Sequence, residues 1–375
     1  MKKLAKTPLN WYDLGMESVA TNVLEVQKKM RIKKAIIISS LFLLTVVMFF
    51  VCWFVGVAKM SVKDCFEALG HRGDVNDINA LIIWNTRFPR VIAAVVAGAG
   101  LAVAGLIMQT TLGNVMASPS TLGVSNAAVF GANLSIIGFA GGFLSSGADF
   151  AKTVNTFNPF AVSLIAFLFS SASVMLVLAL CRIKKFSPNT IVLAGIAIGA
   201  IWTAGTTMLQ IFATDVGLSA AVIWSFGDLG RVTLTQDYIM LGFVGAAIIL
   251  FFCLSWRFNA MLGGDNIARS VGVNVTALRV TGLLVGSLIT AMCVSFLGII
   301  GFVGIICPHV VKKLLGHNHV VSIPITALTG SLLLLFADTI ARTIANGIAL
   351  PVGAVTSLLG APFFLFMLFT AKERV

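Results

Sequence analysis

Uncharged stretches of apolar residues alternate with short polar segments along most of the chain. The longest stretch follows Arg90 and runs for 58 residues before the next charged side chain, Asp149. Because a helix of about 20 apolar residues crosses a bilayer, this stretch is long enough for two membrane spans. Gly113, Asn114 and Pro119 interrupt its apolar pattern and predict the turn between them.

Small residues mark the first of these two spans. Ala94, Gly98 and Ala102 lie four positions apart and therefore share one face of a helix. Within lipid, such a face lets neighbouring helices approach closely, because packing replaces the hydrophobic effect in holding them together. The stretch therefore predicts the packed wall of a polytopic membrane protein, with Arg87 and Arg90 at its entrance.

The same pattern predicts an all-α protein with about ten transmembrane helices behind a basic tail. The tail, residues 1–34, is either a helix lying in the cytoplasmic interface or a solvated segment. The rest of the chain, residues 35–375, forms one transmembrane domain with a long inner segment at 257–276. The predicted spans are 35–58, 90–109, 118–136, 159–181, 190–213, 238–256, 277–297, 302–315, 323–344 and 352–371.

Composition and charge place most of the surface in lipid. Charged residues make up 11% of the chain and hydrophobic residues 58%, whereas a soluble domain carries about 25% charged residues. On the ten-span map, 18 of the 26 Lys and Arg residues fall on the side that holds both termini. Positive charge accumulates on cytoplasmic segments, so the N- and C-termini are predicted to be cytoplasmic. Anionic lipid then accounts for the net charge of +12, and no nucleic-acid partner is expected.

The sequence lacks the motifs of common catalytic and nucleotide-binding sites. It contains no GxxxxGK[ST] phosphate loop and no HExxH or GxSxG motif, so we expect no enzyme activity, cofactor or metal site in this chain. His317 and His319 flank an asparagine in an inner turn, where solvation is favoured over metal binding. Asp338 is the one acidic residue expected inside a span, and we predict that it pairs with Arg342 one helical turn later. A translocator without a coupling ion or nucleotide site needs energy from a partner.

Several motifs carry a family resemblance, which covers about residues 80–371. They are RFPR at 87–90, GLIMQ at 105–109, NVMASP at 114–119 with LGVS at 122–125, LGGDNIARSVGV at 262–273, GFVGIICPHVVKKLLG at 301–316, ADTIAR at 337–342 and LPVGAVTSLLGAP at 350–362. In this order they resemble the FecCD/BtuC-type permeases, the transmembrane subunits of bacterial ABC importers for iron–siderophore complexes, haem and vitamin B12. The chain departs from the family motifs at Val115, Met116 and Ala349.

The resemblance implies a type II ABC importer of BtuC-like architecture in the bacterial or archaeal cytoplasmic membrane. Such a permease moves an iron chelate by alternating access at the interface with a second copy of itself or a homologous permease. ATP-binding cassette ATPase subunits, which hold ATP and Mg, drive it, and a periplasmic or lipid-anchored substrate-binding protein feeds it. The same machinery importing vitamin B12 or haem is the alternative. An ion-coupled secondary carrier is disfavoured by the shortage of charges within the spans.

The resemblance also implies sites. In the family, arginines at the outer face receive carboxylates of the binding protein, which here are Arg87, Arg90 and Arg342. Guanidinium suits this role because it binds carboxylate in a bidentate manner and keeps its charge. Anchoring of a helix end at the membrane interface is the alternative role for Arg87 and Arg90.

The inner segment 257–276 is where such permeases place short helices into a cleft of each ATPase subunit. Gly263 and Gly264 permit a sharp turn, Asp265 favours a helix start and Gly272 can end that helix. We expect Ala268 to lie at the contact with the ATPase.

Residues on the span at 190–213 are candidates for the translocation path. Gly195, Gly199 and Thr203 share one face of that span. Ordinary packing between helices is the alternative reason for this small-residue face.

Overall fold

The computed structural model describes residues 11–56, 58, 60–71, 76–139, 158–183, 186–344 and 349–370. These residues are almost entirely helical, as predicted for an all-α protein. They divide into two compact units, Met1–Leu44 and Thr45–Val375. The outer loop expected between the spans at 118–136 and 159–181 lies almost wholly outside the described residues.

One helix, α1 (Trp11–Phe54), begins in the first unit and ends in the second. It has 44 residues and no break near residue 34, so the described part of the basic tail continues directly into the predicted first span. The tail is helical from Trp11 onward, which either of the two alternatives allows. Its location at a membrane interface stays a prediction.

The second unit is a bundle of helices with short connections. After α1 the elements are α2 (Val62–Gly70), α3 (Ile78–Ile82), η1 (Ile83–Arg87), α4 (Phe88–Thr111), η2 (Pro119–Leu122), α5 (Val124–Asn133), η3 (Leu134–Phe139), α7 (Pro159–Ile183), α8 (Pro188–Ile211), α9 (Asp215–Ser225), η5 (Leu229–Arg231), α10 (Leu234–Cys253), α11 (Ser255–Met261), α12 (Asp265–Ser270), α13 (Val275–Leu297), α14 (Val303–Leu315), α15 (His319–Thr343) and α16 (Val352–Thr370).

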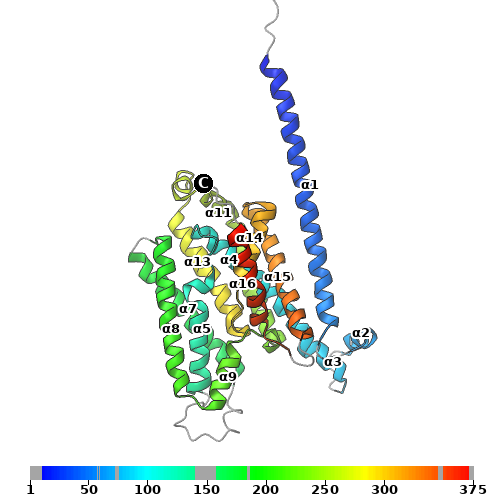
Figure 1. Cartoon of the computed structure of the whole chain (residues 1–375), viewed down its shortest axis with the longest axis vertical. Helices are drawn as coiled ribbons and strands as arrows, with labels where there is room; N and C mark the ends of the chain where they lie inside the picture. The colour runs from blue at the N-terminus through cyan, green and yellow to red at the C-terminus, as the bar shows by residue number, and fades with distance from the viewer. Residues whose placement is uncertain are drawn as a thin grey trace, which may run out of the picture. The chain divides into compact units, whose positions relative to one another are not determined.

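Helix α4 is the centre of this bundle. It begins with Pro89 in its first turn, where the missing N–H leaves no hydrogen bond unmade. It is buried over nearly its whole length and packs against α10, α13, α14 and α15 (Figure 1). The buried apolar residues of these helices form the largest core cluster of the described chain. We call the end where α4 begins and α15 ends the outer end, and the opposite end the inner end.

Backbone contacts explain why α4 is rich in small residues. A Cβ atom at Gly98 would lie 2.4 Å from the carbonyl oxygen of Gly330 on α15, and one at Gly330 would meet Ala102 at 2.5 Å. A Cβ atom at Gly105 would likewise overlap the backbone of Gly304 on α14. The predicted close approach through the face of Gly98 and Ala102 is therefore confirmed, and only glycine fits at these crossings.

The ten predicted spans fall into two groups in the structure. Seven lie on helices that are long and apolar enough to cross a membrane, counted over the described residues. The other three lie on shorter helices: 118–136 covers η2, α5 and part of η3, 302–315 matches α14, and 352–371 matches α16.

The segment 214–237, between the predicted spans at 190–213 and 238–256, is largely helical and partly buried. Trp224 closes α9 and is 4% exposed. The backbone after α9 pairs with the end of α13 through a bridge between Phe226 and Ile299. Asp237, just before the predicted span at 238–256, lies in the first turn of α10 and is fully buried.

Candidate functional site

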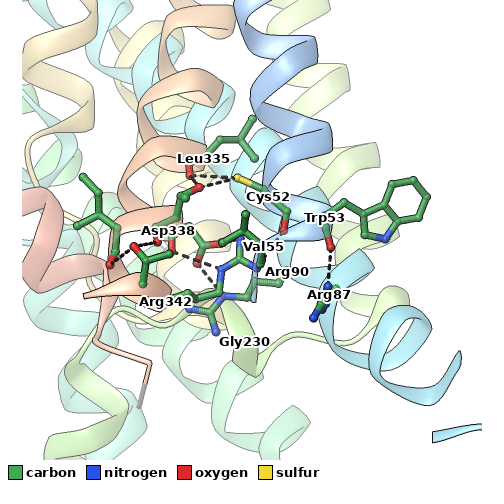
Figure 2. Close-up of polar contacts among 12 residues, drawn as sticks. Cys52, Trp53, Val55, Arg87, Arg90, Gly230, Leu335, Asp338 and Arg342 are labelled. Carbon is green, nitrogen blue, oxygen red and sulfur yellow. Dashed lines mark hydrogen bonds and ion pairs between the residues drawn. The ribbon is translucent and has the colours of Figure 1, made fainter. Parts of the chain in front are cut away.

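Two groups of polar residues flank the core, one at each end of α4. The outer arginine cluster consists of Arg87, Arg90, Asp338 and Arg342. Asp338, on α15, is completely buried and faces two guanidinium groups (Figure 2). The Nε of Arg90 donates to its Oδ1 at 2.7 Å, and the Nη2 of Arg342 forms an ion pair with its Oδ2 at 2.8 Å. The predicted pairing of Asp338 with Arg342 is confirmed.

The outer arginine cluster also holds the end of α1. Arg342 donates from Nη1 to the carbonyl oxygens of Cys52 (3.0 Å) and Val55 (2.7 Å). Arg87 donates from Nη1 to the carbonyl oxygens of Trp53 (3.0 Å) and Phe54 (2.9 Å) (Figure 2). The last carbonyl groups of a helix have no partners within the helix, so these arginines satisfy them. The cluster therefore joins α1, α4 and α15 at the outer end.

This geometry bears on the docking role expected of the three arginines. Arg87, Arg90 and Arg342 are 3%, 7% and 6% exposed, and each is engaged with groups of its own chain. Only Arg90 reaches toward the surface, where its Nη1 lies 3.5 Å from Asp228, whose side chain is 41% exposed. An external carboxylate would have to displace these internal partners. Docking stays a prediction, while the internal clamp is a role that the motif alone did not indicate.

The inner end carries the segment expected to meet the ATPase. Gly264 has a φ of 97°, which allows the sharp turn between α11 and α12. Asp265 is the first residue of α12, and Gly272, with a φ of 84°, follows its end. The predicted turn, helix start and helix end are therefore confirmed. The coupling role of Gly263, Gly264, Asp265 and Gly272 stays a prediction.

Ala268 requires a correction. Its side chain is 0% exposed and belongs to the main core cluster, because this face of α12 packs against the bundle. It therefore cannot provide the contact surface expected of it. The exposed face of the segment instead presents Leu262, Ile267 and Val271, which are 44%, 56% and 58% exposed.

Arg279 fixes α12 to the bundle, and sequence reasoning did not single it out. This residue, in the second turn of α13, donates from Nη2 to both carboxylate oxygens of Asp265 at 2.9 and 3.0 Å. Its Nε donates to the carbonyl oxygen of Thr111 at 2.8 Å. Its Nη1 lies 3.4 Å from the carbonyl oxygen of Phe186, between α7 and α8. The only signal in the sequence was a charge close to an apolar span.

A second inner contact joins α11 to the start of α15. The Nδ1 of His319 lies 2.9 Å from Asn259 Oδ1, and its Nε2 lies 2.9 Å from the hydroxyl of Thr110 on α4. His319 is fully buried, so the expectation that it is solvated was wrong, whereas His317 is exposed. Because His319 lies in a polar stretch of the sequence, the sequence did not indicate that it links three helices. Together, Asp265, Arg279, Asn259, His319 and Thr110 form the inner polar junction.

The small residues of α8 face another part of the same chain. A Cβ atom at Gly195 would lie 2.5 Å from the carbonyl oxygen of Thr121. The side-chain amide of Asn126, on α5, donates to the carbonyl oxygen of Gly199 and to the hydroxyl of Thr203, both at 3.1 Å. These residues therefore pack α8 against η2 and α5. Their role in a translocation path stays a prediction.

The departures from the family motifs lie at the surface. Val115 and Met116, in the inner turn after α4, are 58% and 41% exposed, and Ala349 is exposed before α16. Within the described ranges, no group of three His, Cys, Asp or Glu side chains could hold a metal ion. The described cysteines are all free.

A bundle of long apolar helices, with charges buried among them at one end, defines a multi-pass membrane protein. Its family follows from the sequence: the model of the FecCD transport family matches residues 44–370, and the chain belongs to this family.

Relatives with transport names support this assignment. A "putative ABC transporter permease protein" of Methanocaldococcus jannaschii is 44% identical, over 92% of this chain and 98% of its own. The iron(3+)-hydroxamate import system permease protein FhuG of Bacillus subtilis is 32% identical, over 91% and 98%. The vitamin B12 import system permease protein BtuC of Vibrio cholerae is 32% identical, over 76% and 82%.

A solved structure has the same fold. It is described as an inward-facing conformation of a "putative metal-chelate type ABC transporter" and matches with a TM-score of 0.75 and 25% identity, over 89% of this chain and 98% of the other. The chain is thus an ABC importer permease of the FecCD/BtuC type, and the predicted fold class is confirmed.

Proposed function

We propose that the chain imports an iron chelate of the ferric siderophore class across the cytoplasmic membrane. The observation that carries this proposal is the similarity to FhuG, a permease named for iron(3+)-hydroxamate import, over 91% of the chain. Permeases named for vitamin B12 and hemin import match at 32% identity over 76% and 78% of the chain. Cobalamin or haem is therefore the second candidate cargo.

The proposed transporter contains two permease subunits, this chain and a second copy of it or a homologue. Alternating access at their interface moves the cargo. Two partner ATPase subunits bind ATP and Mg, and α11 and α12 meet them through the exposed Leu262, Ile267 and Val271. Apolar side chains that face water on short, firmly held helices are typical of a surface that a partner covers.

An external binding protein delivers the cargo at the outer end. Arg87, Arg90 and Arg342 remain the proposed receptors for its carboxylates. Because these side chains are buried and paired, their replacement by glutamate would also disturb the fold. Docking is therefore better tested through the exposed carboxylate beside them, Asp228. Asp228→Asn removes a charge that competes for Arg90, so we expect tighter binding of the binding protein, measured as a lower Kd on permease held in nanodiscs.

Reconstitution tests the proposed cargo and its energy source. Proteoliposomes would hold the permease with its partner ATPase and binding protein, and would be offered ferrichrome, haemin or cyanocobalamin. We expect ATP-dependent accumulation of ferrichrome that stops when ATP is replaced by a non-hydrolysable analogue. Uptake of haemin or cyanocobalamin instead would reassign the cargo. Accumulation without ATP and driven by an ion gradient would contradict the importer mechanism.

A further inference from the structure

Arg279 contacts three segments that are distant in sequence. Its guanidinium group reaches the first residue of α12, the last residue of α4 and the turn between α7 and α8, through Asp265, Thr111 and Phe186. The side chain is 7% exposed. Five N–H groups in a rigid planar fork allow arginine to make several directed bonds at once, which lysine cannot do.

Each of the three segments leads to a different part of the bundle. Asp265 begins α12, whose Ala268 is packed in the core while Ile267 and Val271 face outward. Thr111 ends α4, the central helix. Phe186 has a φ of 55°, a conformation rarely adopted by residues other than glycine, and stands two residues before the start of α8.

From α8 the contacts continue toward the outer half of the bundle. Gly195 and Gly199 lie directly against η2 and α5, with Asn126 bonded to Gly199 and Thr203. A displacement of α12 that kept the bonds of Arg279 would therefore also displace the start of α8 and the elements packed against it. The Asp265 end of this connection is 39% exposed and the Arg279 end is buried, so it runs from the surface into the core.

We propose that Arg279 is the positioning residue that transmits movement of α12 to α4 and α8, and so couples ATP hydrolysis in the partner to opening of the bundle. This proposal rests on the function proposed above, because it requires the ATPase to meet α11 and α12. Arg279 does not contact the cargo or the nucleotide. Its effect is to make α12, the end of α4 and the α7–α8 turn move as one body.

The coupling ratio, meaning cargo molecules imported per ATP hydrolysed, measures this directly in the proteoliposomes described above, with ferrichrome as cargo. A variant that only lowers the amount of folded transporter lowers import and hydrolysis together and leaves the ratio unchanged. For Arg279→Gln we expect the ratio to fall at least about fivefold, the lower end of typical coupling between sites. Arg279→Lys keeps the positive charge but not the planar fork of N–H donors, so its coupling ratio should fall less. The exchange of Arg279→Asp with Asp265→Arg should recover part of the ratio.

Arg182→Gln is the matched control, because Arg182 lies exposed in the last turn of α7, outside the proposed contact with the ATPase. Its coupling ratio should equal that of the wild type. If Arg279→Gln keeps the wild-type ratio, or if Arg182→Gln lowers it equally, the proposal is overturned.

A distance measurement separates this proposal from the proposed function. Spin labels at Asn189 and Ser270, both exposed, would report the relation between the start of α8 and the end of α12. Cys253→Ser removes the one exposed cysteine among the six, the others being buried. We expect a narrow distance distribution in wild type and Arg182→Gln, and a broad one in Arg279→Gln, even if no cargo is transported. A broad distribution with an unchanged coupling ratio would assign Arg279 a purely structural role and overturn the proposal.

Discussion

The outer arginine cluster and the inner polar junction both hold helices together, but through different chemical groups. Each joins helix ends around α4, but the outer cluster does so with full charges whose carboxylate is completely buried. The inner junction combines one partly exposed ion pair with amide, hydroxyl and imidazole groups. Buried charges tolerate little displacement, because an ion separated from its partner in the core is not solvated. The comparison indicates that the outer end is a fixed joint and the inner end one that can be moved by a partner.

The strongest way to break the outer joint is to remove its carboxylate. Asp338→Ala leaves Arg90 and Arg342 buried without their counter-charge, so we expect a loss of about 3–5 kcal/mol of folding free energy. Thermal unfolding of the purified protein in detergent would show it as a large fall in melting temperature. Asp228→Ala is the control, since this partly exposed carboxylate lies 3.5 Å from Arg90; its loss should cost at most about 1 kcal/mol. Equal effects of the two variants would contradict the role of Asp338 in stabilising the outer arginine cluster.

At the inner end, removal of a buried link should cost less. His319→Ala takes away one side-chain hydrogen bond to Asn259 and one to Thr110, and at about 0.5–1.5 kcal/mol for each bond we expect a loss of about 1–3 kcal/mol. His317→Ala, two residues away and exposed, is the matched control and should leave the melting temperature unchanged. If both variants melt alike, His319 does not hold the helices together.

The smallest expected effect concerns a buried carboxylate outside both groups. Among the residues that the structure describes, Asp237 has no hydrogen-bond partner for either carboxylate oxygen, although its side chain is fully buried. Replacement by an apolar residue of similar size removes an unsatisfied polar group, so Asp237→Leu should stabilise the protein by about 1 kcal/mol. The melting temperature would rise, in contrast to Asp338→Ala. A fall would show that the carboxylate has a partner that this structure does not contain.

The contacts that could be predicted from the sequence are those between residues close to each other along the chain. The small-residue face of Gly98 and the pairing of Asp338 with Arg342 depend on helical periodicity, which is visible in the sequence. The bond from Arg90 to Asp338 joins residues 248 positions apart, and that from Arg279 to Thr111 joins residues 168 apart. No local pattern encodes such contacts, because they arise only when the helices pack.

The burial of individual side chains was predicted least well from the sequence. Asp237 lies just outside the predicted span at 238–256, and Ala268 was expected at the contact with the ATPase, but both side chains are 0% exposed. In a membrane protein a charged residue usually marks the end of a span. Asp237 instead lies within α10, which begins at Leu234. For Ala268, a six-residue helix is too short for its buried face to be recognised from periodicity.

The glycine crossings of α4 determine where this permease can bend. Gly98 and Gly105 are seven residues apart, a separation of about 10 Å along the helix axis, and each touches the backbone of a different helix. Neither α14 nor α15 can swing away from α4 without separating these backbone contacts and the side-chain bonds beside them, from Ser331 to Val95 and from Gln109 to Gly304. Helices α4, α14 and α15 therefore form one rigid unit. In the alternating access proposed above, the helices around these three would change their positions, so engineered hinges or conformational locks belong there.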